Sequence, residues 1–247
     1  MPLREGGSLP AIVEADDGFL YAAKFRGAGQ GVKSLVAEFI GCEVARTLEL
    51  KVPEVVFAKL NEGFGRTEPD EEIQDLLKAS TGMNLGVHYL SGAITFDPAA
   101  NQPDPLFASS VLWLDAFLMN VDRTPRNTNM LVWKKETWLI DHGASLYFHH
   151  SWSNIMDYID KPFVQVSDHV FTPFASEMDA VDERLASKLT REKLSDICSA
   201  IPDELLSYPE SASPEEVREV YFTFLTERLK RRSVFVNYAK SSHESLV

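Results

Sequence analysis

Three side chains with oxygen donors stand near one another in the middle of the chain, and their types and order fit one kind of chemistry. Asp122 and Asn127 form a D-x-x-x-x-N pattern, and Asp141 follows in the segment LIDHG. Transfer of a phosphoryl group from MgATP to a hydroxyl needs a carboxylate that orients the hydroxyl and oxygen ligands that hold the metal on the phosphates. Asp122 fits the first role, and the oxygens of Asn127 and Asp141 suit Mg²⁺. The pattern therefore predicts a phosphotransfer site.

A β-hairpin is predicted to bring two of these residues together. Residues 129–133 and 137–140 have strand composition, and the residues between them form a turn. Because a hairpin brings its two ends together, Asn127 and Asp141 are expected to be neighbours, with Gly143 relieving crowding beside the metal. Each residue alone is more often a turn former, so the prediction rests on their joint order.

An apolar helix over residues 105–120 is predicted to lie in the core and to present the loop from its end. Asp115 within this helix is expected to be an ordinary polar contact. Arg123 and Arg126 belong to the loop itself. They are placed to offset charge that develops on the transferred group.

The first part of the chain supplies a candidate phosphate-binding lysine. Strands are predicted over residues 11–15 and 19–25 around the turn DDG, and alternation places Lys24 on a mostly apolar face. An ammonium group there needs an anion, and a nucleotide phosphate would serve; a lysine lying along an exposed edge strand is the alternative. Backbone N–H groups could also approach phosphates ahead of the first strand, at Gly6-Gly7-Ser8.

A helix is predicted next, over residues 34–48. Glu38 lies on it beside small residues, so it could reach Lys24 and hold it in position; a solvated helix carboxylate is the alternative. Cys42 has apolar neighbours and is expected to be buried filler rather than a ligand or nucleophile. A strand over residues 54–60 is expected to lead into the connector under the adenine, near Leu60 to Gly63.

The order of these motifs resembles known kinases. D-x-x-x-x-N, a hairpin and I-D-H-G together resemble the catalytic loop and the D-F-G of protein kinases, with His142 in place of the aromatic residue. N-x-D-x-x-x-x-N without a preceding H-R-D is more similar to HipA-like kinases. Phosphoinositide kinases are also similar here, through D-R-x-x-x-N and a hydrophobic-D-x-G. The G-x-G-x-x-G and A-P-E signatures of protein kinases are absent from the sequence.

The resemblance implies a two-lobed α+β fold of the protein-kinase type, with ATP between the lobes. The small β-rich N-lobe would span residues 1–60 and the mainly helical C-lobe residues 61–247. Lys24 would hold the α- and β-phosphates with help from Glu38. HipA-like kinases imply phosphorylation of serine or threonine in a protein, sometimes within toxin–antitoxin systems, although nothing in the sequence identifies an antitoxin-like partner. A lipid or small-molecule kinase and a nucleotide-binding pseudokinase that serves as an interaction module are the alternatives.

Composition limits the partners. The 247 residues carry a formal net charge of −13 with a pI of about 4.9, so a basic face for direct nucleic-acid binding is not expected. The sequence has no apolar run long enough for a membrane span and no signal peptide, and its two cysteines give neither a disulfide framework nor a zinc-binding spacing. These features predict a cytoplasmic protein.

The remaining segments are less regular. A short helix is predicted from Pro69 to about Ser80, followed by loops over 82–92 and 97–105. Helices are predicted over 178–207 and 213–238. The adjacent His149 and His150 are expected to be exposed loop residues. Beyond Gly143 the resemblance to kinases fades.

Overall fold

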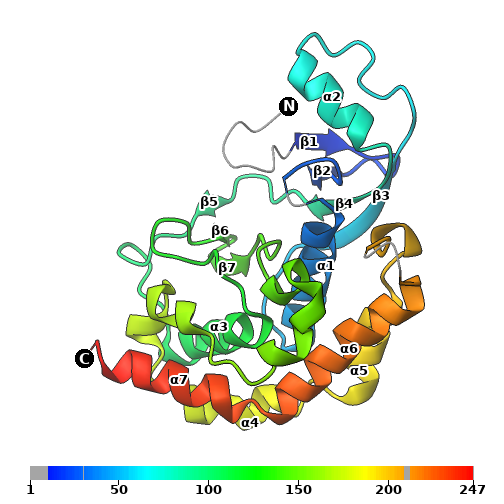
Figure 1. Cartoon of the computed structure of the whole chain (residues 1–247). Coiled ribbons are helices and arrows are strands. Elements are labelled where there is room, and N and C mark those ends of the chain that lie inside the picture. Colours follow the sequence, from blue (N-terminus) through cyan, green and yellow to red (C-terminus); the bar gives the residue numbers. More distant parts are fainter. Residues whose placement is uncertain (1–10, 30, 209–211, 247) are drawn as a thin grey trace.

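The computed structural model describes residues 11–29, 31–208 and 212–246. Its first region is an antiparallel sheet with the strand order β1-β2-β4-β3. The strands are β1 (Ala11–Glu14), β2 (Leu20–Lys24), β3 (Val55–Leu60) and β4 (Gly82–His88). Figure 1 shows α1 (Val32–Thr47) running from this sheet into the helical region, and α2 (Glu71–Ala79) at the outer end of the sheet.

The second region is mainly helical and surrounds a small sheet of order β5-β6-β7. Its strands are β5 (Ile94–Thr95), β6 (Met130–Trp133) and β7 (Glu136–Leu139). Its α-helices are α3 (Pro105–Leu118), α4 (Met178–Ala186), α5 (Arg191–Ser199), α6 (Pro214–Lys230) and α7 (Ser233–Glu244). Short 3₁₀ helices cover Tyr147–His150, Trp152–Tyr158, Val164–Asp168, Thr172–Phe174 and Asp203–Leu205. The predicted α+β class, with a small β-rich region before a helical one, is confirmed.

Strand β4 departs most from the predicted fold, because residues 82–92 were expected to be a loop. The structure places β4 between β2 and β3, so the first sheet continues past residue 60 to His88. The glycines of this segment permit close packing within the sheet: a Cβ added at Gly86 would come within 3.0 Å of Val56. The chain accordingly leaves this sheet after His88, and not near Leu60 to Gly63 as predicted.

The predicted C-terminal helices are each divided. Residues 178–207 form α4, α5 and a 3₁₀ turn, because Thr190 begins a new helix by accepting a hydrogen bond from the Lys193 N–H. The second segment forms α6 and α7 with a break after Lys230, and it continues past its predicted end at 238 to Glu244. At the start of α6, Ser213 and Glu216 make a reciprocal capping box. None of the helices in the described part of the chain is long and apolar enough to span a bilayer.

Helix α3 is the centre of the helical core, and its C-terminal end carries the predicted catalytic loop. Trp113 and Phe117 on this helix are fully buried. Arg228 of α6 reaches across the core, where its guanidinium donates to the carbonyls of Ala116 at 2.8 Å and Phe117 at 2.9 Å. Carbonyls of a last helical turn have no partner within their own helix, so Arg228 satisfies groups that would otherwise be orphaned. This contact fixes the place where the loop begins.

Candidate active site

Lys24 brings three separate parts of the chain together. Its Nζ lies 2.7 Å from Oε2 of Glu38 and 2.7 Å from Oδ1 of Asp141. Strand β2, helix α1 and the loop after β7 therefore meet at one ammonium group. The structure thus makes the contact between Lys24 and Glu38 that the sequence left open against a solvated carboxylate.

The charges of this group depend on one another. Burial alone would lower the pKa of Lys24, but the carboxylates of Glu38 and Asp141 outweigh burial and raise it. The ammonium group in turn holds the pKa of Asp141 below its usual value. Burial raises the pKa of Glu38 against the opposing effect of Lys24. Lys24 and Asp141 are therefore both charged at neutral pH.

A cavity of about 350 Å³ opens beside Lys24, a size suited to a small ligand. Both Asp122 and Asp141 line it, which brings two of the three predicted oxygen donors to the same space as the lysine. The other lining residues are Phe25, Ala28, Gly29, Ser34, Leu35, Gly143 and Ala144.

The loop around Asp122 is held by amide side chains. Asn127 donates from Nδ2 to Oδ2 of Asp122 at 3.0 Å. Asn129 donates to the same oxygen at 3.2 Å and to the Asp122 carbonyl at 3.0 Å. Asn129 has a φ of 47°, a conformation that asparagine tolerates better than most residues. This role of Asn129 was not predicted, because residue 129 was included in the strand over 129–133, whereas β6 begins at Met130.

The oxygen donors at this site fit a hard divalent cation. Asp141 lines the cavity and accepts the hydrogen bond of Lys24 at Oδ1, so its second carboxylate oxygen is a candidate metal ligand. Asn127 uses its amide N–H groups toward Asp122, so its carbonyl oxygen can serve a metal. Carboxylate and amide oxygens are ligands that Mg²⁺ prefers. The pairing of Asn127 with Asp141 at one metal stays a prediction.

The two loop arginines do not behave alike. Arg123 was expected to face the transferred group, but its side chain is turned into the core with 1% exposure. There its Nε lies 2.5 Å from Oδ2 of Asp115, and its NH1 donates to the carbonyls of Thr128 and Asn129. A guanidinium buried in this way cannot contact a nucleotide in the cleft. Arg126 is exposed, and its contact with phosphate stays a prediction.

Asp115 is the centre of a buried polar network and not the ordinary contact that was expected. Besides Arg123, it accepts hydrogen bonds from Asn120 at 2.9 Å and pairs with Nε2 of His169 at 2.9 Å. Burial would raise the pKa of Asp115, but Arg123 and His169 outweigh it and lower the pKa. Asn120 in turn accepts from the Asp122 N–H at 3.2 Å. The network therefore connects α3 with the loop and with the segment after residue 168.

Two histidines of this region are buried, and the burial of His149 contradicts its prediction. His149, expected to be exposed, is fully buried, with Nδ1 3.1 Å from the Tyr221 hydroxyl. It is buried because Phe148 and His149 of the 3₁₀ helix Tyr147–His150 pack against Tyr221 and Phe224 of α6. His150 is exposed as predicted. His142 is also fully buried, and burial, with a smaller effect of Arg123, lowers its pKa to about 3. The predicted phosphate-contacting turn, Gly6-Gly7-Ser8, lies outside the described residues.

A small antiparallel sheet with a lysine bound to a helix glutamate, above a loop–hairpin–aspartate arrangement, is the architecture of a kinase. The chain belongs to the HipA-like kinase family: the profile described as HipA-like kinase matches residues 2–234. The crystal structure of the proinflammatory kinase CtkA of Helicobacter pylori is similar in fold, with a TM-score of 0.60 and 14% identity over 100% of this chain and 95% of that chain. No curated protein matches the sequence. The predicted kinase-like fold, kinase activity and HipA-like resemblance are thereby confirmed.

Proposed function

We propose that this kinase transfers the γ-phosphoryl group of MgATP to a hydroxyl, and that the acceptor is a serine or threonine of a protein. One observation carries the proposal: Lys24 is 2.7 Å from both Glu38 and Asp141 beside a cavity that Asp122 also lines. A cation fixed by two carboxylates, with a third carboxylate in the lining of the same cavity, is a preorganised site for phosphates and a hydroxyl. The serine or threonine acceptor rests on the family.

Each residue has a separate role in this proposal. Lys24 holds the phosphates, and Glu38 keeps the lysine in position. Asp122 orients the acceptor hydroxyl and takes its proton, while Asn127 and Asp141 provide the oxygens that would hold Mg²⁺. When bound, Mg²⁺ neutralises charge on the phosphates. Exposed Arg126 is the remaining loop cation that could contact the transferred group.

The test uses labelled ATP and Mg²⁺ with the full chain, alone and with cell extract. Wild type is compared with Asp122→Ala and Asp141→Ala, and Asp160→Ala is the matched control because Asp160 forms an exposed ion pair with Arg231. We expect label transfer by wild type and the control, and none by the other two variants. Acid hydrolysis of the labelled protein should then release phosphoserine or phosphothreonine.

Other outcomes distinguish the alternatives. Label found in a lipid or small-molecule fraction would show that the acceptor is a lipid or a small molecule and not a protein. Stabilisation of the chain by ATP without any transfer would indicate a pseudokinase, and transfer that survives both active-site substitutions would contradict the proposed roles. The expectation of an antitoxin-like partner rests on the family alone, so a search for such a partner follows only once phosphoryl transfer is established.

A further inference from the structure

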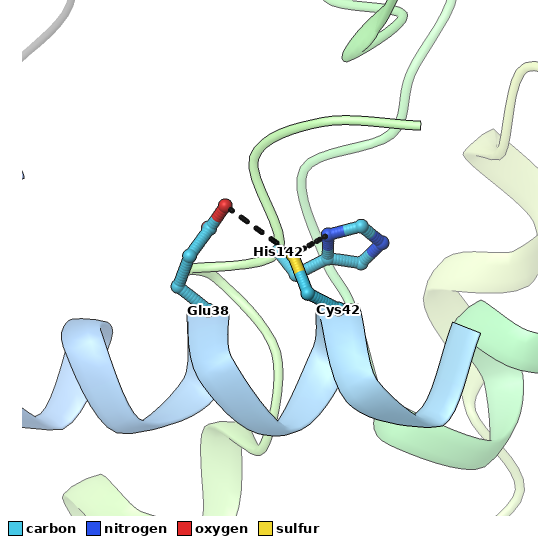
Figure 2. A group of neighbouring side chains, drawn as sticks. All are labelled: Glu38, Cys42 and His142. Atoms are coloured by element: carbon cyan, nitrogen blue, oxygen red, sulfur yellow. Dashed lines mark hydrogen bonds between the residues drawn. The ribbon is translucent and has the colours of Figure 1, made fainter. Parts of the chain in front are cut away.

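A second group of ligand-type side chains lies next to the phosphate-binding lysine, on the other side of Glu38. Glu38 and Cys42 are one turn apart on α1 and therefore share a face. His142, which directly follows Asp141, packs onto this face from the loop after β7 (Figure 2). Sγ of Cys42 lies 3.6 Å from Nδ1 of His142 and 3.9 Å from Oε1 of Glu38, and the three ligand atoms are all within 4.8 Å of one another.

The imidazole of His142 is poorly satisfied. Glu38, Cys42 and His142 all have 0% exposure. Nε2 of His142 has no hydrogen-bond partner among the described residues, and Nδ1 faces only the thiol sulfur, a weak partner. A buried polar ring without good hydrogen bonds is costly. Nε2 lies on the far side of the ring, and Nδ1, whose weak partner is the Cys42 thiol, is the nitrogen that an ion among the three side chains would satisfy. Figure 2 shows Nδ1 of His142 directed toward Sγ of Cys42, with the Glu38 carboxylate on the other side of that sulfur.

We propose that Glu38, Cys42 and His142 bind a divalent zinc-type ion. Sulfur, imidazole nitrogen and carboxylate oxygen are the three ligand types that zinc takes in proteins. Zinc bonds of about 2.3 Å to sulfur and about 2.0 Å to nitrogen, at a tetrahedral angle, place those two atoms roughly 3.5 Å apart. The observed 3.6 Å between Sγ and Nδ1 matches this spacing. Water would complete the coordination, as it does at three-ligand zinc sites.

This site is compatible with the ion pair of Lys24. Glu38 gives Oε2 to Lys24 at 2.7 Å and turns Oε1 toward Cys42, so one carboxylate serves both neighbours. Lys24 carries one positive charge against the carboxylates of Glu38 and Asp141. A divalent ion that displaces the Cys42 thiol proton to solvent adds one positive charge and makes the group neutral. The ion would then lock α1 onto the loop that carries Asp141.

The site differs from the predicted magnesium position in its ligand chemistry. Thiolate and imidazole favour zinc-type ions, whereas Mg²⁺ prefers oxygen. Cobalt(II) is therefore a suitable probe, because thiolate ligation gives it an intense near-ultraviolet charge-transfer band that oxygen ligands do not give. The experiment needs no nucleotide, so its result does not depend on the proposed phosphotransfer.

The test adds Co²⁺ to the full chain and compares wild type with Cys42→Ala and Cys198→Ala. Cys198 is the matched control because it is also a buried free cysteine, on α5. We expect the charge-transfer band in wild type and Cys198→Ala, its loss in Cys42→Ala, and its disappearance when Zn²⁺ is added. A wild type without the band, or a band that persists in Cys42→Ala, would overturn the proposal.

A second variant keeps the proposal testable if Cys42→Ala does not fold. His142→Phe retains a ring at the same position but removes the nitrogen ligand. We expect Zn²⁺ to raise the thermal midpoint of wild type and not of His142→Phe, and a chelator to reverse the rise. Equal stabilisation of both proteins by Zn²⁺ would place the ion elsewhere.

Discussion

The proposed phosphate binding depends on the ammonium group of Lys24. Its two carboxylate partners at 2.7 Å fix it in place before any ligand arrives. We expect Lys24→Met to lower kcat/KM for ATP by about 100-fold or more, because loss of one preorganised electrostatic contact typically costs 10²–10³. The measurement is label transfer at several ATP concentrations. Lys59→Met is the control and should act like wild type, because Lys59 is the exposed residue of β3. A Lys24→Met enzyme within a few-fold of the control would contradict the role.

Gly41 permits the approach of the loop to α1. A Cβ at this position would lie 2.4 Å from Cβ of His142, closer than such atoms ever approach. Alanine would favour the helix by about 1 kcal/mol, but overpacking in a core costs roughly 1–3 kcal/mol. We therefore expect Gly41→Ala to be less stable in urea unfolding and to lose label transfer, since Asp141 would move with His142.

A double mutant is the control for Gly41→Ala. In a His142→Gly background the obstructing side chain is gone, so Gly41→Ala should cost less stability there than in wild type. An equal cost in both backgrounds, or a Gly41→Ala protein more stable than wild type, would contradict the packing argument.

At the scale of elements, Asp115 on α3 is a positioning residue for the loop and the hairpin. Through Arg123 it is connected to the carbonyls of Asn129 and of Ile140, the residue before Asp141. We expect Asp115→Ala to destabilise the protein by about 3–5 kcal/mol, because it leaves the guanidinium of Arg123 buried without its partner. Urea unfolding measures the loss.

Asp160→Ala is again the comparison, since its ion pair with Arg231 is exposed and is expected to change stability little. Asp115→Asn separates positioning from folding. It keeps the side-chain shape and the contact with Asn120 but weakens the pair with Arg123. We therefore expect Asp115→Asn to lose label transfer while it keeps more of the free energy of unfolding than Asp115→Ala does. An Asp115→Asn enzyme with full activity would show that the network only holds the fold together.

Local signals explain which elements the sequence could predict. The strands of the hairpin are adjacent in sequence, and the turn is made by Lys134 and Lys135 with φ of 51° and 67°. Strand β4 was missed because its glycines resemble turn formers, and only its neighbours β2 and β3 show why they suit a sheet. The network of Asp115 was missed for a related reason: His169 is 54 residues away, and no local pattern pairs them. Arg123 was misplaced for another reason: its partner Asp115 is only 8 residues away, but it lies across the end of α3, and no sequence pattern indicates that pair.

At the scale of the whole molecule, α1 joins the two regions of the kinase. Glu38 of this helix pairs with Lys24 of the first sheet. Gly41 and Cys42 of the same helix contact His142, which belongs to the helical region. Nearly every residue from Leu35 to Ala45 is buried. A displacement of α1 would therefore separate Lys24 from Glu38 and disturb Asp141 in one step, which is why single changes at this helix are expected to affect activity and stability together.

Three buried histidines make the stability of the whole fold depend on pH. Burial lowers the pKa of His142 to about 3 and lowers the pKa values of His149 and His169. Below pH 6.5 the unfolded chain binds protons at these rings and the folded chain does not, so stability falls as the pH falls. Burial raises the pKa of Glu38, so this group takes up its proton more readily in the folded chain and opposes the loss of stability. It accounts for one proton, against three for the histidines. Carboxylates with lowered pKa values, such as Asp141, act at lower pH.

We therefore expect the free energy of unfolding of the metal-free protein to fall between pH 7 and pH 5, by on the order of 2 kcal/mol for each buried histidine at most. Urea unfolding at the two pH values measures it. His149→Phe keeps a ring beside Tyr221 but removes one proton-binding site, so it should reduce the fall by about a third. Equal or greater stability at pH 5 would mean that these rings are protonated in the folded protein, and an unchanged fall in His149→Phe would assign the proton uptake to other groups.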